Sequence, residues 1–182
     1  MKKQLSRILS FIGIALLGIV AFASVAQAKL PANIEEFNAA YAEQAKTPEG
    51  AVHLWLEANF LYSNPATRSL GKDILVLMTE NLNADFEKKP SDATYVERMK
   101  DEAHIFRSYC QGAVPDNGYK ADLDNCELTV TKSIENADGS WSVFIKSGGA
   151  DNARQIKLVK KDDGHYHVSQ YSTIYQKIRP AK

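Results

Sequence analysis

The sequence predicts an α+β protein, with N-terminal helices packed on a curved antiparallel C-terminal sheet in a cone-like arrangement. Three observations predict it. Apolar residues recur at helical spacing between residues 34 and 106, apolar and polar residues alternate between residues 128 and 169, and turn residues rather than helices separate the alternating segments. Such a sheet has one apolar face that must be covered, so we expect the preceding helices to pack on it.

The element expected at the centre of the core is a helix over residues 48–62. Thr47 is a preferred N-cap residue, and Pro48 suits the first helical position because the amide hydrogen that it lacks has no helical partner there. The apolar stripe of this helix is Val52, Trp55, Leu56 and Phe60. A helix this apolar is mostly buried, and we expect it to fill the concave side of the sheet. Further helices are predicted after Asn33, over residues 70–82, and from residue 91 or 92 to about residue 109.

The sheet is expected to be a meander of consecutive strands. Four strands are predicted, over residues 128–134, 141–146, 156–160 and 166–169. The core-facing residues expected on the first two are Leu128, Val130, Ile134, Trp141, Val143 and Ile145. The turns at 136–139, 148–152 and 162–164 contain Gly, Asn and Asp, which tolerate positive φ in tight hairpins. No crossover helix fits between these strands, so the pairing should be antiparallel.

The N-terminus has the pattern of a secretory signal. Lys2, Lys3 and Arg7 precede an apolar run over residues 8–23, and Ala26-Gln27-Ala28 places small residues at the positions that a signal peptidase reads. We therefore expect residues 1–28 to be removed between Ala28 and Lys29, leaving a single α+β domain over residues 29–182. Cleavage of the signal predicts a periplasmic or secreted protein with no membrane attachment. The alternative is that residues 1–28 stay in place as an uncleaved membrane anchor.

Charge and cysteine content narrow the function classes. Without the signal, 19 basic and 22 acidic residues remain, a net charge of about −3 that argues against binding to nucleic acid or anionic lipid. The two cysteines, Cys110 and Cys126, are expected to form a disulfide in an oxidising compartment, with two buried free thiols as the alternative. Their spacing excludes a CxxC redox site.

The order of these elements resembles the cone-shaped α+β superfamily of nuclear transport factor 2, which includes ketosteroid isomerase-like domains. The segments 47–51, 112–119, 155–158 and 163–168 look more narrowly like a bacterial exported family of uncharacterised function. The resemblance implies a small-ligand pocket between helix and sheet, and a homodimer formed through the open sheet face. No catalytic motif of the superfamily matches this chain position by position, so no catalytic residue is carried over.

Aromatic and histidine side chains supply the candidate ligand pocket. Their rings can line an apolar cavity while a hydroxyl or ring nitrogen binds a polar group. The candidates are His53, Trp55, Tyr62, Tyr109, Trp141 and Tyr171. The alternative is that these residues are core or rim, with His53 a hydrogen-bonded boundary residue rather than a general base. If the chain bends after its last strand, Tyr171 and Tyr175 lie close together and indicate a partner surface.

Other chemistry finds little support in the sequence. His165 and His167 lie two apart on a strand and point to the same side, but no third metal ligand is evident, so we expect neither a metal nor a cofactor. The hypothesis that follows is an exported, non-enzymatic binding or interaction module, acting on a protein partner or holding a small apolar ligand between helix and sheet. Two alternatives stay open: a small-molecule isomerase or lyase with an acid or base in the pocket, and an inhibitor or immunity-type protein that acts through the surface around the disulfide loop.

Overall fold

The computed structural model describes residues 29–182, and the predicted signal sequence with its cleavage site lies outside these residues. The α-helices are α1 (Ile34–Gln44), α2 (Pro48–Ser63), α3 (Arg68–Met78), α4 (Ala93–Asp101) and α5 (His104–Arg107). Short 3-10 helices are η1 (Phe86–Lys88), η2 (Pro90–Asp92), η3 (Pro115–Asn117) and η4 (Leu123–Asn125). The strands are β1 (Val130–Glu135), β2 (Trp141–Ile145), β3 (Arg154–Lys160) and β4 (Tyr166–Gln170). The helices precede the sheet, as predicted for an α+β fold.

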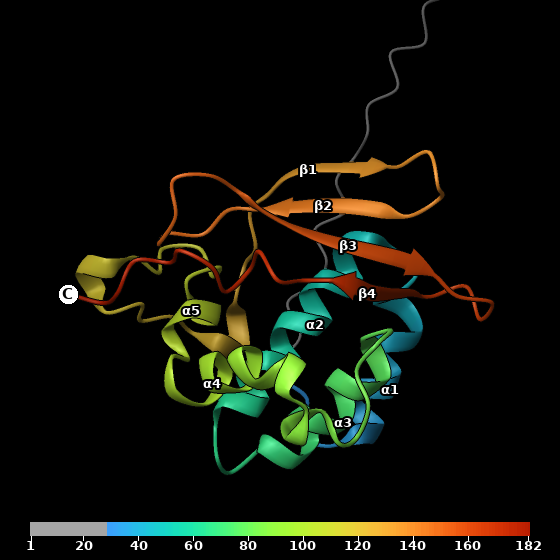
Figure 1. Cartoon of the computed structure of the whole chain (residues 1–182), viewed down its shortest axis with the longest axis horizontal. Coiled ribbons are helices and arrows are strands. Elements are labelled where there is room, and N and C mark those ends of the chain that lie inside the picture. The colour runs from blue at the N-terminus through green and yellow to red at the C-terminus, as the bar shows by residue number, and fades with distance from the viewer. Residues whose placement is uncertain (1–28) are drawn as a thin grey trace, which may run out of the picture.

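The sheet is the predicted antiparallel meander. Its strand order is β1-β2-β3-β4, and each strand pairs with the next in the antiparallel sense. The sheet is curved and unclosed, and the helices lie on one side of it (Figure 1). Gly139 and Gly164 have φ values of 79° and 85° in the two outer hairpin turns, as the turn sequences predict.

Helix α2 occupies the centre of the core, between the other helices and the sheet (Figure 1). The Thr47 hydroxyl caps it by accepting a hydrogen bond from the Gly50 amide at 3.1 Å. All but three of its sixteen residues are buried. On the sheet, Val143, Ile156 and Val168 are fully buried, so the predicted packing of the apolar helix on the concave sheet face is confirmed.

Strand β1 departs from the prediction. Val130 and Ile134 were expected in the core, but they are 37% and 38% exposed. Strand β1 lies at one edge of the sheet (Figure 1), and a bulge interrupts its pairing with β2 between Val130 and Lys132. Leu128 lies outside the strand and forms an isolated bridge with Cys110. In this edge strand, whose pairing is interrupted by the bulge, alternation does not correspond to burial.

Two helix ends differ from the sequence-based boundaries. Helix α3 ends at Met78 rather than at residue 82, since the next residues pair with the edge of the sheet: Thr79 forms a parallel bridge with Val168, and the Glu80 amide donates to the Val168 carbonyl at 2.8 Å. The helix predicted from residue 91 to about 109 is broken into α4 and α5. Glu102 leaves the helical conformation, with φ −126° and ψ 45°, and its carboxylate pairs with Arg98 one turn earlier.

Cys110 and Cys126 form the predicted disulfide, with their Cα atoms 4.9 Å apart. The turn at 148–152 does not use positive φ, contrary to the prediction. Its glycines instead allow close approach: a Cβ on Gly148 would lie 2.0 Å from the Ala113 carbonyl oxygen. Across residues 29–182, helices long and apolar enough to cross a membrane are absent.

Candidate functional site

A cluster of aromatic rings lies where α2, α4 and the segment after β4 meet. Trp55 of α2 stacks on Tyr95 of α4 with ring centroids 6.2 Å apart. Tyr171, which follows β4, contacts both, at 5.3 Å from Trp55 and 4.6 Å from Tyr95. Rings from three distant parts of the sequence therefore form one packed group, which we call the aromatic cluster: Trp55, Tyr95, Phe106, Tyr171 and Tyr175.

The inner members of the aromatic cluster are closed to solvent and hydrogen-bonded. The Trp55 indole N–H donates to the Thr79 hydroxyl at 3.1 Å. The Tyr95 hydroxyl donates to Asn59 Oδ1 at 2.7 Å, and Asn59 Nδ2 donates to the Trp55 carbonyl at 2.7 Å. Trp55 and Asn59 have no exposed surface and Tyr95 has 2%. These residues occupy the space beneath the sheet in which the sequence places a ligand pocket.

The outer members, Tyr171 and Tyr175, are half-buried. Their ring centroids lie 6.5 Å apart in an edge-to-face arrangement, which confirms the prediction that the two come together where the chain bends. Burial, followed by the negative charge of Asp92, raises the pKa of both hydroxyls, so both are neutral at physiological pH. Neither hydroxyl forms a hydrogen bond to another part of the described chain.

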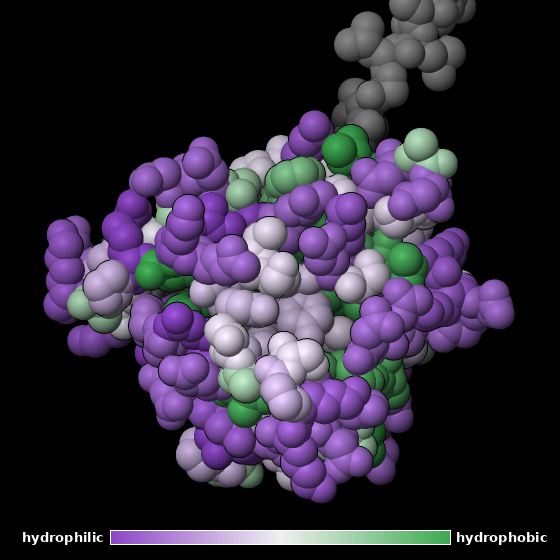
Figure 2. Space-filling model, viewed as in Figure 1, coloured by the Kyte–Doolittle hydropathy of each residue, from purple (hydrophilic) through white to green (hydrophobic). Residues whose placement is uncertain are grey.

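Asp92 is the last residue of η2 and precedes α4. Its backbone is helical, with φ −102° and ψ −3°, so it continues η2 into α4, and its side chain makes no capping hydrogen bond. It is partly exposed, and among residues 29–182 it takes part in no ion pair. In Figure 2 hydrophilic residues surround a pale area of intermediate hydropathy, over the segment that follows β4 and beside α4. We call Asp92, Tyr171 and Tyr175 the tyrosine patch.

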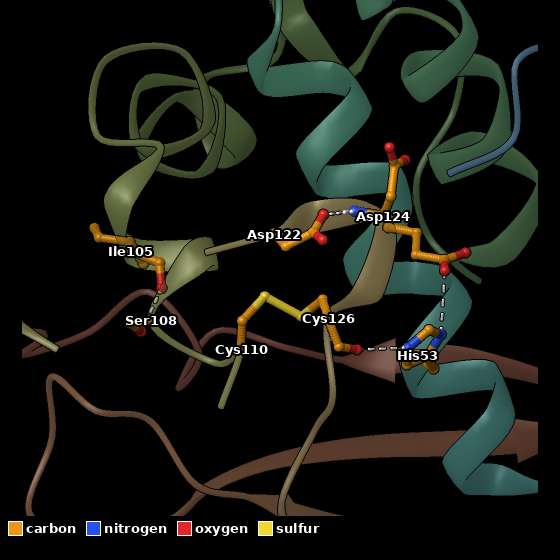
Figure 3. Close-up of a disulfide and its surroundings, with 8 residues drawn as sticks. His53, Ile105, Ser108, Cys110, Asp122, Asp124 and Cys126 are labelled. Atoms are coloured by element: carbon orange, nitrogen blue, oxygen red, sulfur yellow. Dashed lines mark hydrogen bonds and ion pairs between the residues drawn. A yellow bond between two sulfur atoms is a disulfide. The ribbon is translucent and has the colours of Figure 1, made fainter. Parts of the chain in front are cut away.

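His53 lies on α2 beside the disulfide, at the boundary of the core. Its Nε2 lies 3.0 Å from the Cys126 carbonyl oxygen (Figure 3). A carbonyl only accepts, so Nε2 carries the hydrogen and Nδ1 of the neutral ring is an acceptor. Nδ1 lies 3.3 Å from Glu57 Oε1, one helical turn further along. His53 is therefore a hydrogen-bonded boundary residue.

Glu57 is the buried partner of this pair and was not singled out from the sequence. It is 4% exposed, and desolvation raises its pKa to about 8. Burial also lowers the pKa of His53. Both directions favour neutral groups, so the 3.3 Å approach of Glu57 Oε1 to Nδ1 is not an ion pair, and within the described residues Nδ1 has no hydrogen-bond partner. The other ring nitrogen of His53, Nε2, is occupied by its hydrogen bond to the Cys126 carbonyl.

Tyr62 belongs to a different network, centred on a carboxylate. Its hydroxyl donates to Glu87 Oε1 at 2.5 Å. Lys72 and Lys100 bind the same carboxylate at 2.6 and 3.1 Å. These contacts, with Lys72 the largest cause and Tyr62 the next, lower the pKa of Glu87 to about 2. The network joins α2, α3 and α4 around η1 and lies apart from the aromatic cluster.

The remaining two pocket candidates are structural neighbours of the sheet and the chain end. Tyr109 is 1% exposed, and its hydroxyl donates to the Ile174 carbonyl at 2.6 Å. Trp141 is partly buried and packs edge-on against Tyr166 at 6.2 Å. The structure thus brings only Trp55 and Tyr171 together among the six candidates, while His53, Tyr62, Tyr109 and Trp141 lie in separate surroundings.

His165 and His167 do lie on the same side of the chain, but their partner is helix α1. The Tyr41 hydroxyl lies 2.7 Å from His167 Nε2, and its ring stacks on His165 at 4.6 Å. Burial and the neighbouring Asp163 raise the pKa of Tyr41 to about 12. Across residues 29–182, groups of three or more His, Cys, Asp or Glu side chains placed to hold a metal ion are absent.

Two surface hollows lie near the disulfide loop. One of about 440 Å³ is lined by the loop after Ala113 and by the C-terminal residues, including Arg179 and Lys182. Both of these cations are paired, Arg179 with Asp151 and Lys182 with Asp116. The other, of about 280 Å³, is lined by Gln111, Gly112, Asn125 and Glu127. None of the six pocket candidates lines either hollow.

Comparison with known proteins gives a family but no activity. No curated protein and no solved structure matches the chain significantly. The family described as "Domain of unknown function (DUF6935)" matches residues 29–182, the whole of the described fold. The chain therefore belongs to the DUF6935 family.

Proposed function

We propose that this protein is an exported, non-enzymatic binding module that contacts a protein partner through the tyrosine patch. The observation that carries the proposal is a pair of half-exposed tyrosine rings, Tyr171 and Tyr175, seated on a closed aromatic cluster with hydroxyls that bind no other described group. Tyrosine is enriched at binding surfaces because its ring buries apolar area while its hydroxyl makes a directed hydrogen bond.

The patch is held in place before any partner arrives. The Tyr171 ring packs against the buried rings of Trp55 and Tyr95. Between the two tyrosines, the Thr173 hydroxyl donates to the Gln155 carbonyl at 2.7 Å, and the Ile174 carbonyl accepts from Tyr109. A preorganised surface loses little conformational entropy on binding, so a modest contact area can still give useful affinity.

Two features favour a surface over an internal ligand site. Trp55 and Tyr95 fill the space between helix and sheet and satisfy their own polar atoms within the protein. A small ligand there would have to displace packed rings, which is unfavourable in a close-packed core. We also propose that the protein is related to the cone-shaped superfamily of nuclear transport factor 2. In this protein, side chains fill the interior space where the superfamily has a ligand pocket.

Acid–base catalysis ranks second. Its support is the perturbed pKa of Glu57, since strongly shifted groups concentrate at active sites. Against it, the Glu57 carboxyl is buried and the outer nitrogen of His53 is occupied by a backbone carbonyl. A substrate would reach neither group without opening α2 from the disulfide loop.

Export is the other half of the proposal. The Cys110–Cys126 disulfide is compatible with an oxidising compartment outside the cytoplasm. Together with the predicted signal, it supports a periplasmic or secreted location.

The test is gentle purification of the protein from its own compartment, followed by native mass spectrometry. We expect a partner chain, either another protein or a second copy, to travel with the wild type and to be lost from the double variant Tyr171→Ser/Tyr175→Ser. The variant Ile134→Ser, which changes an exposed apolar residue on β1 instead, should keep the partner. Retention of the partner by the double variant, or release of a small molecule from the denatured wild type, would contradict the proposal.

A further inference from the structure

We propose that the cations gathered around Tyr62 and Glu87 form a second binding site, which takes the phosphate group of a small soluble molecule. The cations are Arg68 and Lys72 of α3 and Lys100 of α4, and we call these three the basic cluster. None of them belongs to the tyrosine patch, so this inference goes beyond the proposed function and does not depend on it.

Contacts to two shared groups bring the three cations together. Lys72 Nζ and Lys100 Nζ lie 2.6 and 3.1 Å from the two oxygens of the Glu87 carboxylate. The Tyr62 hydroxyl donates to the same carboxylate, and the centroid of its ring lies 5.9 Å from Lys100 Nζ and 5.7 Å from Arg68 Cζ. Arg68 and Lys72 are one helical turn apart, which places both on the same face of α3. The basic cluster therefore converges from two helices on one region of the surface.

The first support is the unbalanced charge of this region. Glu87 pairs with both lysines, and in the part of the chain that the structure describes no other carboxylate lies within ion-pair distance of the basic cluster. Arg68 therefore has no counter-ion there. The two lysine side chains are only 29% and 33% exposed, so solvent screens the excess positive charge incompletely. Three cations against one carboxylate leave a surplus that a dianion would balance.

The second support is the set of hydrogen-bond donors that remain unused. Arg68 Nε donates to the Tyr62 carbonyl at 3.0 Å, and its terminal nitrogens form no hydrogen bond to another residue within 29–182. Each lysine ammonium carries three N–H groups and directs one of them at Glu87. Such donors recognise phosphate oxygens, arginine through paired N–H bonds and lysine as a point charge.

The third support is that close helix packing holds the basic cluster in place. Gly71 lies between Arg68 and Lys72 in the sequence, and a Cβ on it would lie 2.3 Å from the Tyr62 backbone nitrogen. Helix α3 therefore approaches α2 closely, which brings Arg68 against Tyr62. Because α2, α3, α4 and η1 each contribute a member of the network, its donors are positioned before a ligand arrives, and little entropy is lost on binding.

The surplus charge selects the class of ligand. A carboxylate carries a single negative charge and would leave part of the surplus uncompensated. A phosphate monoester carries about −1.5 to −2 near pH 7 and presents three acceptor oxygens. The net negative charge of residues 29–182 opposes a nucleic acid or an anionic membrane, so the ligand is a small soluble phosphate ester.

The experiment titrates isotope-labelled protein with methyl phosphate and follows the backbone amide resonances by NMR. Sulfate, acetate and chloride at matched ionic strength are the comparison anions. We expect saturable shifts with methyl phosphate and sulfate, and only general salt effects with acetate and chloride, at Tyr62, Arg68, Lys72, Glu87 and Lys100. From pH 5 to pH 7.5 the affinity for methyl phosphate should rise severalfold, because a phosphate monoester loses its second proton near pH 6. Sulfate is a dianion throughout and should bind equally at both.

Matched variants isolate the basic cluster. Arg68→Gln and Lys100→Gln each keep a polar side chain and remove one positive charge, so each should weaken binding of methyl phosphate by roughly tenfold. Glu87→Gln removes the competing negative charge and should tighten binding. The control is Lys132→Gln: Lys132 lies over the Phe144 ring at 5.9 Å, belongs to β1 rather than to the cluster, and should be replaceable without loss of binding. Thermal melting of each variant shows that it folds.

Three results would overturn the inference: methyl phosphate shifts no larger than those of chloride, equal affinity for acetate, or equal weakening by Lys132→Gln and Arg68→Gln. Binding to vesicles that contain phosphatidic acid, without binding to methyl phosphate, would overturn the assignment to a soluble ligand. If a cluster variant does not fold, the anion series on the wild type decides. None of these measurements involves Tyr171 or Tyr175, so failure here is distinct from failure of the proposed function.

Discussion

Replacing Glu57 by glutamine should remove an alkaline loss of stability from this protein. Glu57 keeps its proton in the folded state up to a pH of about 8, compared with 4.5 for an ordinary glutamate. Its contribution to stability is therefore complete below pH 4.5 and is lost as the pH rises to about 8. His53 acts in the opposite sense, because its folded pKa is lowered from 6.5. Its contribution is complete above pH 6.5 and is lost as the pH falls.

The two contributions oppose each other over part of the range. Between pH 4.5 and 6.5 Glu57 keeps its proton in the folded state, while His53 is protonated more readily in the unfolded chain than in the folded one, so the His53 contribution offsets part of the Glu57 contribution. Between pH 6.5 and 8 the unfolded chain has lost its proton and the folded pair has not. Each pH unit is worth about 1.4 kcal/mol for one proton, so the wild type should lose about 2 kcal/mol across this window.

The assay is urea unfolding at half-unit steps from pH 5 to pH 9, with the free energy of unfolding extrapolated to water. Glu57→Gln should show no slope between pH 6.5 and 8 and should lose stability below pH 6.5, where the uncompensated His53 acts. Glu97→Gln, which changes an exposed carboxylate on α4, should follow the wild type. If the stability of the wild type is constant from pH 6.5 to 8, or if Glu57→Gln keeps the wild-type slope, the claim that folded Glu57 holds a proton in this window is refuted.

Three further predictions concern stability. Gly71→Ala should destabilise the fold, because the added Cβ would lie 2.3 Å from the Tyr62 backbone nitrogen. Overpacking should cost roughly 3 kcal/mol, which exceeds the gain of about 1 kcal/mol in helix propensity. An unchanged urea midpoint would contradict this prediction and show that α2 and α3 can move apart at little cost. Replacing both cysteines by serine should lower the free energy of unfolding by about 3 kcal/mol, because the disulfide restricts the unfolded chain by closing a loop of this length. A loss near zero in the same urea assay would contradict this explanation. Tyr109→Phe should cost about 1–2 kcal/mol, since it leaves the Ile174 carbonyl without its donor; it should also speed amide exchange over residues 171–178, and exchange that stays as slow as in the wild type would disprove this tether.

The parts of the fold that the sequence predicts well are those encoded locally. Thr47 and Pro48 mark the start of α2 because capping depends on a few adjacent residues, and the hairpin turns at Gly139 and Gly164 likewise depend on local backbone freedom. The burial of β1 was predicted wrongly because alternation distinguishes the two faces of a strand but does not reveal that the strand lies at a sheet edge and carries a bulge. The break at Glu102 has a similar origin, since helical periodicity continues across it.

The candidate site was harder to predict because its chemistry depends on contacts across the chain. The closeness of Tyr171 and Tyr175 could be predicted from four-residue spacing and a bend. Glu57 was passed over as one polar interruption of an apolar stripe. A glutamate four residues after a histidine on a mostly buried helix was the available signal, because helical spacing brings such side chains together.

The disulfide, the helices and the tyrosine patch form one connected structure. Cys110 adjoins Tyr109, and the Tyr109 hydroxyl holds the Ile174 carbonyl between the two patch tyrosines. On the other side, Cys126 accepts the hydrogen bond from His53, which shares α2 with Trp55, the ring beneath Tyr171. Both halves of the disulfide therefore lead by short contacts to the patch, one through the chain end and one through the core helix. A cross-link placed at this junction holds the segment that carries Tyr171 and Tyr175 from two directions, which explains how a short, coiled C-terminal segment keeps its aromatic rings in place.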